Sequence, residues 1–150
     1  MPAGFSNQTS IDFISLFEQT CIRTINTMLE ASDWFFAVFH LGLTGFNLIG
    51  WAFVKTRRLH FWSILLTLLA WLLIGLYVGR IGYCPLTDWH WDIKRELGQS
   101  QLPGSFIKYY ADLWFNYDFD RMLIDWLTGA SGILAFLIST YLNFFKKSIR

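Results

Sequence analysis

The chain has 150 residues, of which 54% are hydrophobic, 19% aromatic and only 15% charged. A soluble globular domain carries about a quarter charged residues, so this composition excludes an ordinary soluble domain and favours a membrane protein. The net charge is only +1, and no basic footprint of the kind that binds nucleic acid is present, so we expect no nucleic-acid partner.

Residues 10–32 predict an amphipathic helix that Ser10 can cap. Its charged and amide side chains fall away from an apolar stripe made of Ile11, Ile14, Phe17, Cys21, Ile25 and Met28. A segment with this many polar residues is expected to lie on the membrane surface rather than to cross the membrane as a fourth span. A helix packed on the extramembrane part of the protein is the alternative.

Three segments are long and apolar enough to cross a bilayer, namely residues 34–54, 61–83 and 126–145. The first would form about 31 Å of helix, which suffices for the hydrocarbon layer. Residues 84–125 join the second and third spans and predict two short interfacial helices, over 88–97 and 105–117. We therefore expect one all-α membrane domain over residues 1–150, with three transmembrane helices, the N-terminal amphipathic helix and a cap at residues 84–125.

The distribution of charge predicts the orientation of these spans. All eleven acidic residues lie within the first 33 residues or between 88 and 125, whereas two basic clusters contain no acid: Lys55, Arg57 and Arg58, and Lys146, Lys147 and Arg150. Basic loops remain on the cytoplasmic side of a membrane. We therefore expect the N-terminus and residues 84–125 outside, the C-terminus in the cytoplasm, and the lipid bilayer as the surroundings of the spans.

Residues 82–92 gather an unusual number of reactive side chains where the second span is expected to end. With His40, which would lie about 10 Å into the first span, they could converge at the outer mouth of the bundle. The candidate site comprises His40, Cys84, Thr87, Asp88, His90 and Asp92. His40, His90 and Cys84 are the side chains best suited to a transition metal. In the alternative interpretation Pro85 ends the span, Thr87 or Asp88 caps the next helix, and tryptophans anchor that helix at the interface.

A polar stripe runs along the first span, because His40, Thr44, Asn47 and Trp51 recur at helical spacing. Polar groups in a membrane are candidates for function, but they also serve as hydrogen-bonding partners between helices. The partners available to this stripe are Ser63, Thr67, Ser131 and Ser139.

His60 falls at the opposite end of the second span, about 36 Å of helix from Cys84. A haem held between His40 and His60 is therefore disfavoured. We interpret His60 as an interfacial or backbone-capping residue.

Small residues predict close helix packing on two faces, one with Gly75, Gly79 and Gly82 and one with Gly132, Ala135 and Ser139. The two cysteines, Cys21 and Cys84, leave open whether a single disulfide joins them.

The motif Gly82-Tyr83-Cys84-Pro85-Leu86-Thr87-Asp88-Trp89-His90-Trp91, followed by Arg95-Glu96-Leu97-Gly98 and by Pro103-Gly104-Ser105-Phe106-Ile107-Lys108-Tyr109, resembles a family of small bacterial membrane proteins. That family is a domain of unknown function with a Cys-Pro-Leu-Thr signature at the end of its second span. The likeness runs from about residue 40 to residue 125, and its Asp-Trp-His-Trp form is similar to members from Bacteroidetes-type bacteria. In other members we expect Glu at position 90 and His at position 109, which weakens the transfer of a metal or acid/base role. The resemblance implies a multi-pass protein of the bacterial inner membrane and supplies no reaction.

Three functional hypotheses follow, in order of preference. The first is a non-catalytic subunit, assembly factor or binding module that acts through its outer aromatic cap on another membrane protein or on a second copy of the chain. The second is a membrane enzyme or a metal or redox protein with its site at the outer mouth. The third is a transporter, which would need an oligomer because three spans are too few to enclose a path.

Overall fold

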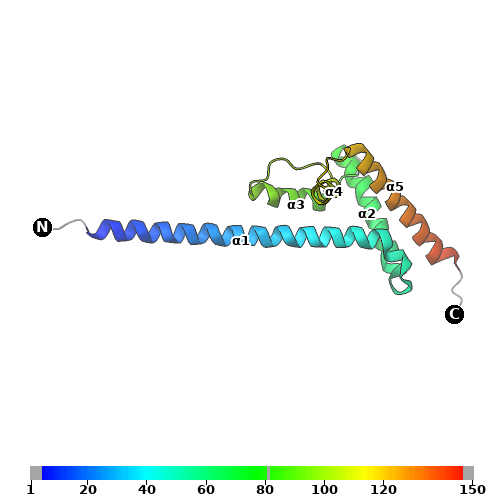
Figure 1. Ribbon diagram of the computed structural model, residues 1–150. Coiled ribbons are helices and arrows are strands. Elements are labelled where there is room, and N and C mark those ends of the chain that lie inside the picture. Colours follow the sequence, from blue (N-terminus) through cyan, green and yellow to red (C-terminus); the bar gives the residue numbers. More distant parts are fainter. Residues whose placement is uncertain (1–4, 81, 147–150) are drawn as a thin grey trace.

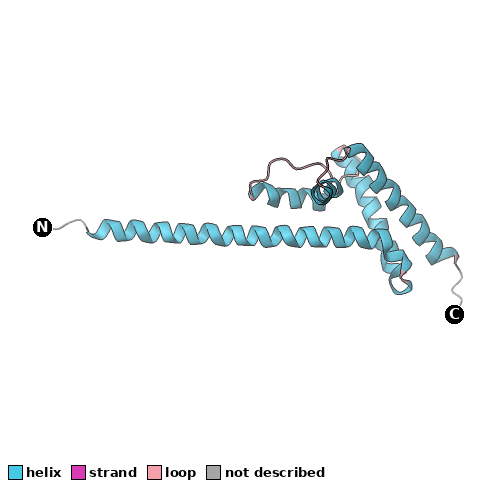
Figure 2. Cartoon of the chain, viewed as in Figure 1, coloured by secondary structure: helices cyan, strands magenta, loops and turns pink. Residues whose placement is uncertain are grey.

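The computed structural model describes residues 5–80 and 82–146, with side chains described from residue 15 onward. The described part contains α-helices and short helical turns and no strand, as Figure 2 shows, and this confirms the all-α prediction. The helices are α1 (Phe5–Ile49), α2 (Arg57–Val78), α3 (Pro85–Glu96), α4 (Phe106–Phe115) and α5 (Arg121–Thr140). Two 3₁₀ turns, Gly50–Ala52 and Val54–Thr56, join α1 to α2, and a π-helical turn, Tyr141–Phe145, continues α5.

The first helix differs from the prediction, because residues 10–32 and 34–54 do not form separate elements. α1 is a single helix of 45 residues that passes through Asp33 without a break and ends at Ile49. The sequence between Phe5 and Leu41 contains no glycine or proline that would interrupt it. Position 10, the expected cap, lies inside this helix, and the side chain of Ser10 is outside the described residues.

The second span begins and ends earlier than the predicted range of 61–83. α2 ends at Val78 because Gly79 takes a left-handed conformation, with φ at +76°. The Gly79 and Arg80 amides donate back to the carbonyls of Leu76 and Gly75, at 3.3 and 2.7 Å, which is the usual glycine-ended helix terminus. Gly79 therefore terminates the helix instead of continuing a packing face.

α3 and α5 also begin earlier than predicted, whereas α4 falls within the predicted range of 105–117. α3 starts with Pro85 in its first turn, so Thr87 and Asp88 lie inside the helix and do not cap it. α5 starts at Arg121, where the Asp120 carboxylate accepts a hydrogen bond from the Leu123 amide at 2.8 Å. The third span is therefore longer than the predicted 126–145.

α2 and α5 run side by side in opposite directions and pack against the C-terminal part of α1 (Figure 1). The small residues predicted on α5 are buried there: Gly132, Ala135 and Ser139. α3 lies along α1, and α4 contacts α5. The predicted cap of residues 84–125 ends earlier, because α5 begins at Arg121. Residues 84–120, which we call the cap from here on, thus sit over one end of the helix pair. The N-terminal half of α1 extends well beyond the rest of the molecule.

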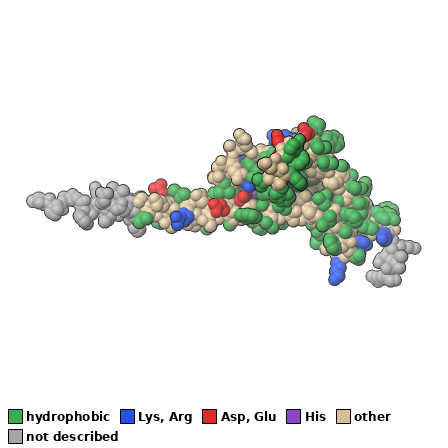
Figure 3. Space-filling model, in the orientation of Figure 1, with side chains coloured by type: hydrophobic (Ala, Val, Ile, Leu, Met, Phe, Trp, Pro, Cys, Tyr) green, Lys and Arg blue, Asp and Glu red, His purple; other side chains and the backbone are tan. Residues whose placement is uncertain are grey.

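Three helices are long and apolar enough to cross a membrane: Ser15–Ala52, Arg57–Val78 and Arg121–Phe145. Large apolar side chains are exposed along all three, which suits contact with lipid and identifies a membrane protein. Figure 3 shows apolar side chains over the visible face of α2 and α5, with lysine and arginine at the end near the C-terminus. We call this the basic end, and its described basic residues are Lys55, Arg57, Arg58 and Lys146. Lys147 and Arg150, part of the predicted orientation signal, are outside the described residues.

Candidate functional site

Three side chains fasten the cap to α1. His90 and Lys94 project from successive turns of α3 toward Asp33 on α1. The Nε2 atom of His90 donates to Oδ1 of Asp33 at 2.6 Å, and the Lys94 ammonium lies 2.9 Å from the same oxygen. His90 is fully buried and Lys94 is only 4% exposed. We call Asp33, His90 and Lys94 the clasp.

Burial governs the protonation of the clasp histidine. Desolvation lowers the pKa of His90 below its usual value, and this outweighs the opposing effect of the Asp33 carboxylate. His90 is therefore neutral at pH 7, with its proton on Nε2, and Nδ1 is left as an acceptor. Nδ1 is buried and has no hydrogen-bond partner among the described residues.

His40 lies about two turns of α1 beyond the clasp residue Asp33, next to aromatic side chains. It is 8% exposed, and its ring stacks on Phe106 of α4 with 3.9 Å between centroids. Its Nε2 atom is 3.9 Å from the sulfur of Cys84, and its buried Nδ1 has no partner in the described part of the chain. Phe106 also contacts His90, at 5.8 Å between centroids, so it separates the two imidazoles.

The structure thus brings together only part of the predicted outer site. His40 approaches Cys84, and His90 lies on the other side of Phe106. Thr87 is buried within α3, whereas Asp88 accepts a hydrogen bond from Tyr83, which raises the pKa of that phenol. Asp92 pairs with Arg95 at 2.5 Å on an exposed face. Within the described residues, no three His, Cys, Asp or Glu side chains are grouped closely enough to hold a metal ion.

A second buried cluster joins all three spans near the basic end. His60 of α2 is fully buried, and its Nε2 donates to the Asn47 carbonyl of α1 at 2.9 Å. Its Nδ1 accepts from the hydroxyl of Ser139 on α5, also at 2.9 Å. Gly50 makes this approach sterically feasible, because a Cβ there would lie 2.8 Å from the His60 ring. The backbone-capping interpretation of His60 agrees with this geometry.

The polar stripe of α1 provides contacts between helices. The Asn47 amide donates to Thr67 at 3.0 Å and its carbonyl oxygen accepts from Ser63 at 2.7 Å. Thr44 is half-buried, and Trp51, in the 3₁₀ turn after α1, donates to the Leu48 carbonyl at 2.7 Å. For Asn47 the interhelical interpretation is therefore the one that the structure favours.

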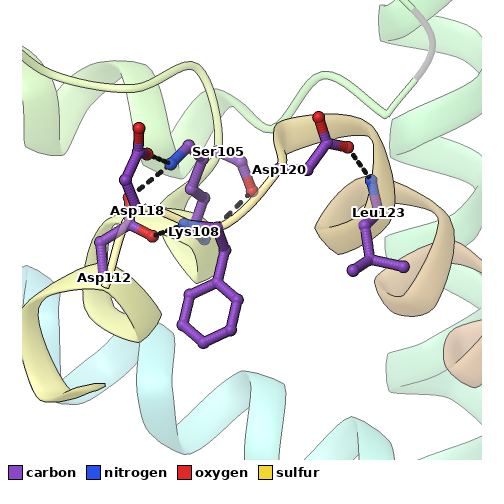
Figure 4. A network of polar contacts seen from close by, with 7 residues as sticks. Ser105, Lys108, Asp112, Asp118, Asp120 and Leu123 are labelled. Atoms are coloured by element: carbon purple, nitrogen blue, oxygen red, sulfur yellow. Dashed lines mark hydrogen bonds and ion pairs between the residues drawn. The ribbon is translucent and has the colours of Figure 1, made fainter. Parts of the chain in front are cut away.

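A third network closes the cap around Lys108 (Figure 4). The ammonium of Lys108, a residue only 9% exposed, contacts the carboxylates of Asp112 and Asp118, each at 2.5 Å. Asp112 also accepts from the Phe119 amide at 2.9 Å. The hydrogen bonds with the two carboxylates raise the pKa of Lys108, and the hydrogen bond from Lys108 lowers the pKa of Asp112. The network holds the end of α4 to the loop that leads into α5.

The sequence interpretation missed several residues that build this region. Asp33, Lys94, Phe106 and Lys108 were not singled out from the sequence, although all contribute buried contacts. One signal was available, because Asp33, His40 and Asn47 are spaced by seven residues and so lie on one face of a helix. Both cysteines are free, with Cys21 exposed on α1, so no disulfide joins Cys21 and Cys84.

Comparison with protein-family models gives a match to the family described as Protein of Unknown function (DUF2784), over residues 30–144. Searches of curated proteins and of solved structures found no match. The matched range begins just before the clasp aspartate, includes the cap and ends in the last turn of the third span. This chain belongs to the DUF2784 family of proteins of unknown function.

Proposed function

We propose that this chain is a non-catalytic binding module of the bacterial inner membrane that presents its cap to another membrane protein. The acid-free basic residues at positions 55, 57, 58 and 146 support a cytoplasmic basic end. The cap and the N-terminus of α1 would then face the periplasm. This arrangement makes the cap the part of the protein that partners can reach from outside.

One observation supports binding over catalysis. The cap's polar groups are largely used to hold it in place, through the clasp and the Lys108 network, whereas the aromatic groups at one of its edges are exposed. At the end of α4 and in the next loop, Trp114, Phe115 and Tyr117 are 64%, 71% and 64% exposed. They lie beside Asp118, whose side chain is 94% exposed. An apolar centre with a charged rim is typical of a protein-binding surface.

Site-specific photocrosslinking tests this proposal. A photoreactive phenylalanine analogue at position 114 or 115 should give one adduct of discrete mass with another membrane protein. The matched control is position 134, a leucine in the middle of α5 that is 59% exposed. It should give lipid adducts alone. If positions 114 and 115 also give only lipid adducts, the aromatic residues anchor the cap in the interface and the binding-module proposal is wrong.

A metal or redox role is the second candidate, and the two buried Nδ1 atoms of His40 and His90 favour it. A histidine whose other nitrogen donates to a carboxylate, as His90 does to Asp33, has the orientation common among metal-binding and catalytic imidazoles. Elemental and absorbance analysis of the purified protein tests this role. A stoichiometric metal that is lost in both His40→Ala and His90→Ala would replace the first proposal with the second. A metal-free wild-type protein would remove this candidate.

A further inference from the structure

The N-terminal part of α1 has an apolar face that nothing in the described chain covers. The helix that is apolar enough to span runs over 38 residues, or about 57 Å, whereas the hydrocarbon layer is about 30 Å thick. Residues 15–32 therefore extend past the spanning part. Phe17 and Met28 in this extension are 69% and 65% exposed.

Seven positions on this face follow a strict heptad pattern. They alternate in steps of four and three residues along α1, and they are Phe17, Cys21, Thr24, Met28, Ala31, Phe35 and Val38. This 3.5-residue period is the one that two helices need to remain in contact along a coiled coil. All seven are exposed. We call these seven residues the heptad face.

The heptad face points away from the rest of the molecule. The intramolecular contacts of α1 use Asp33, Ala37, His40 and Asn47, which are about 180° around the helix from Ala31, Phe35 and Val38. A second helix could therefore lie along the heptad face without meeting the cap, α2 or α5.

The chemistry of the extension favours a helix over a lipid surface as its partner. A helix that lies on anionic lipid carries many lysines and arginines on its polar face, but residues 15–32 contain one basic residue, Arg23, and two acids, Glu18 and Glu30. The hydroxyls of Thr20, Thr24 and Thr27 donate to carbonyls one turn earlier, at 2.8 to 2.9 Å. Their polarity is thus satisfied within the helix, and their methyl groups remain for packing.

We propose that the heptad face binds the same face of a second copy of this chain, in a parallel, two-fold symmetric pair. Two copies inserted into one membrane have the same orientation, so their α1 helices meet in parallel and in register. Cys21 of one copy then faces Cys21 of the other, at the short Cα separation within which a disulfide can form. This contact uses a different surface from the aromatic cap, so the failure of either proposal leaves the other intact.

Disulfide crosslinking of the full-length protein in its native membrane tests the pair. In Cys84→Ser, which leaves Cys21 as the single thiol, mild oxidation should convert more than half of the chain to a dimer. In a background lacking both native cysteines, Met28→Cys should crosslink equally well. Asn26→Cys and Arg23→Cys, which lie off the heptad face, should give at least fivefold less dimer. The side chains substituted on α1 are all exposed, so these changes leave the folded core unchanged. Cys84 is half-buried, and serine nearly matches its size.

Mass measurement in mild detergent gives an independent test. Met28→Glu places like charges across the proposed contact and should shift the protein from dimer to monomer. Ile22→Glu is the matched control, because Ile22 is 53% exposed on the opposite side of α1, and it should remain dimeric. Equal crosslinking at positions 26 and 28, no crosslinking at position 21, or a monomeric wild-type protein would overturn the proposal.

Discussion

Single residues in this protein show how membrane-buried polar groups can be structural. His60 is buried and ionisable, which often marks a functional site in a membrane, yet both of its nitrogens are used by neighbouring helices. Its hydrogen bonds reach Asn47 on α1 and Ser139 on α5, so one side chain on α2 contacts both other spans. His40 and His90 differ, because each retains a buried nitrogen without a partner in the described chain.

Replacing His60 should therefore destabilise the fold more than replacing an ordinary polar residue. His60→Ala leaves the Asn47 carbonyl and the Ser139 hydroxyl without this partner and opens a cavity, at a cost of about 2–4 kcal/mol. Ser131→Ala is the control, since Ser131 donates only to the Thr128 carbonyl of its own helix, and it should cost less than about 0.5 kcal/mol. The free energy of unfolding in mixed micelles measures both. Equal losses would mean that His60 does not join the spans.

At the scale of elements, the clasp determines where the cap sits. The contact between α1 and α3 relies on one carboxylate that is shared by a neutral imidazole and an ammonium, and Phe106 of α4 packs beside that imidazole. A contact that requires a neutral, buried histidine is sensitive to acid.

We predict that the protein loses stability as the pH falls below the ordinary histidine pKa of 6.5. The folded-state pKa of His90 is lower than that value, so the unfolded chain binds a proton at a higher pH than the folded protein does. Acid therefore favours the unfolded state, and the loss of stability accumulates from pH 6.5 down to the folded-state pKa. Above 6.5 both states are neutral and this effect vanishes. The free energy of unfolding should therefore decline between pH 7 and pH 5, and His90→Gln should flatten that decline. An unchanged slope in the variant would assign the acid sensitivity to another group.

Elements were predictable from sequence where one local signal decides them, and were mispredicted where two signals compete. The three spans follow from apolar length, and the packing face of α5 follows from Gly132, Ala135 and Ser139. The expected break before Trp34 rested on the polar residues of 10–32. Polar side chains determine whether a helix faces water or lipid, but they do not end it. Gly79 was assigned to packing because its left-handed conformation depends on where α2 stops.

The candidate site was harder to predict, because it depends on contacts distant in the sequence. His40 and Cys84 were placed at one end of the bundle, and they do approach each other. The pairing of His90 with Asp33 spans 57 positions, and no local spacing reveals it. Charged residues near the end of a predicted span or on a short interfacial helix are usually solvated, so Asp33 and Lys94 did not stand out.

For the whole molecule, the proposed orientation is open to direct measurement. A single cysteine at position 84, in a Cys21→Ser background, should react with a membrane-impermeant maleimide added to intact spheroplasts. A cysteine placed at position 56, next to the basic residues, should react only after the membrane is opened. The opposite labelling pattern would reverse the topology and place the cap in the cytoplasm.

α1 is attached to the rest of the protein at two points and extends far beyond them. The clasp fixes it at Asp33 and the His60 cluster fixes it at Asn47, with about 21 Å of helix between the two points. About 48 Å of uninterrupted helix separates Asn47 from Ser15, so a tilt of about 5° around Asn47 moves the far end by about 4 Å. A small rearrangement where the three spans meet would therefore displace the N-terminal end of α1 by a larger distance, and the clasp at Asp33 would oppose that tilt.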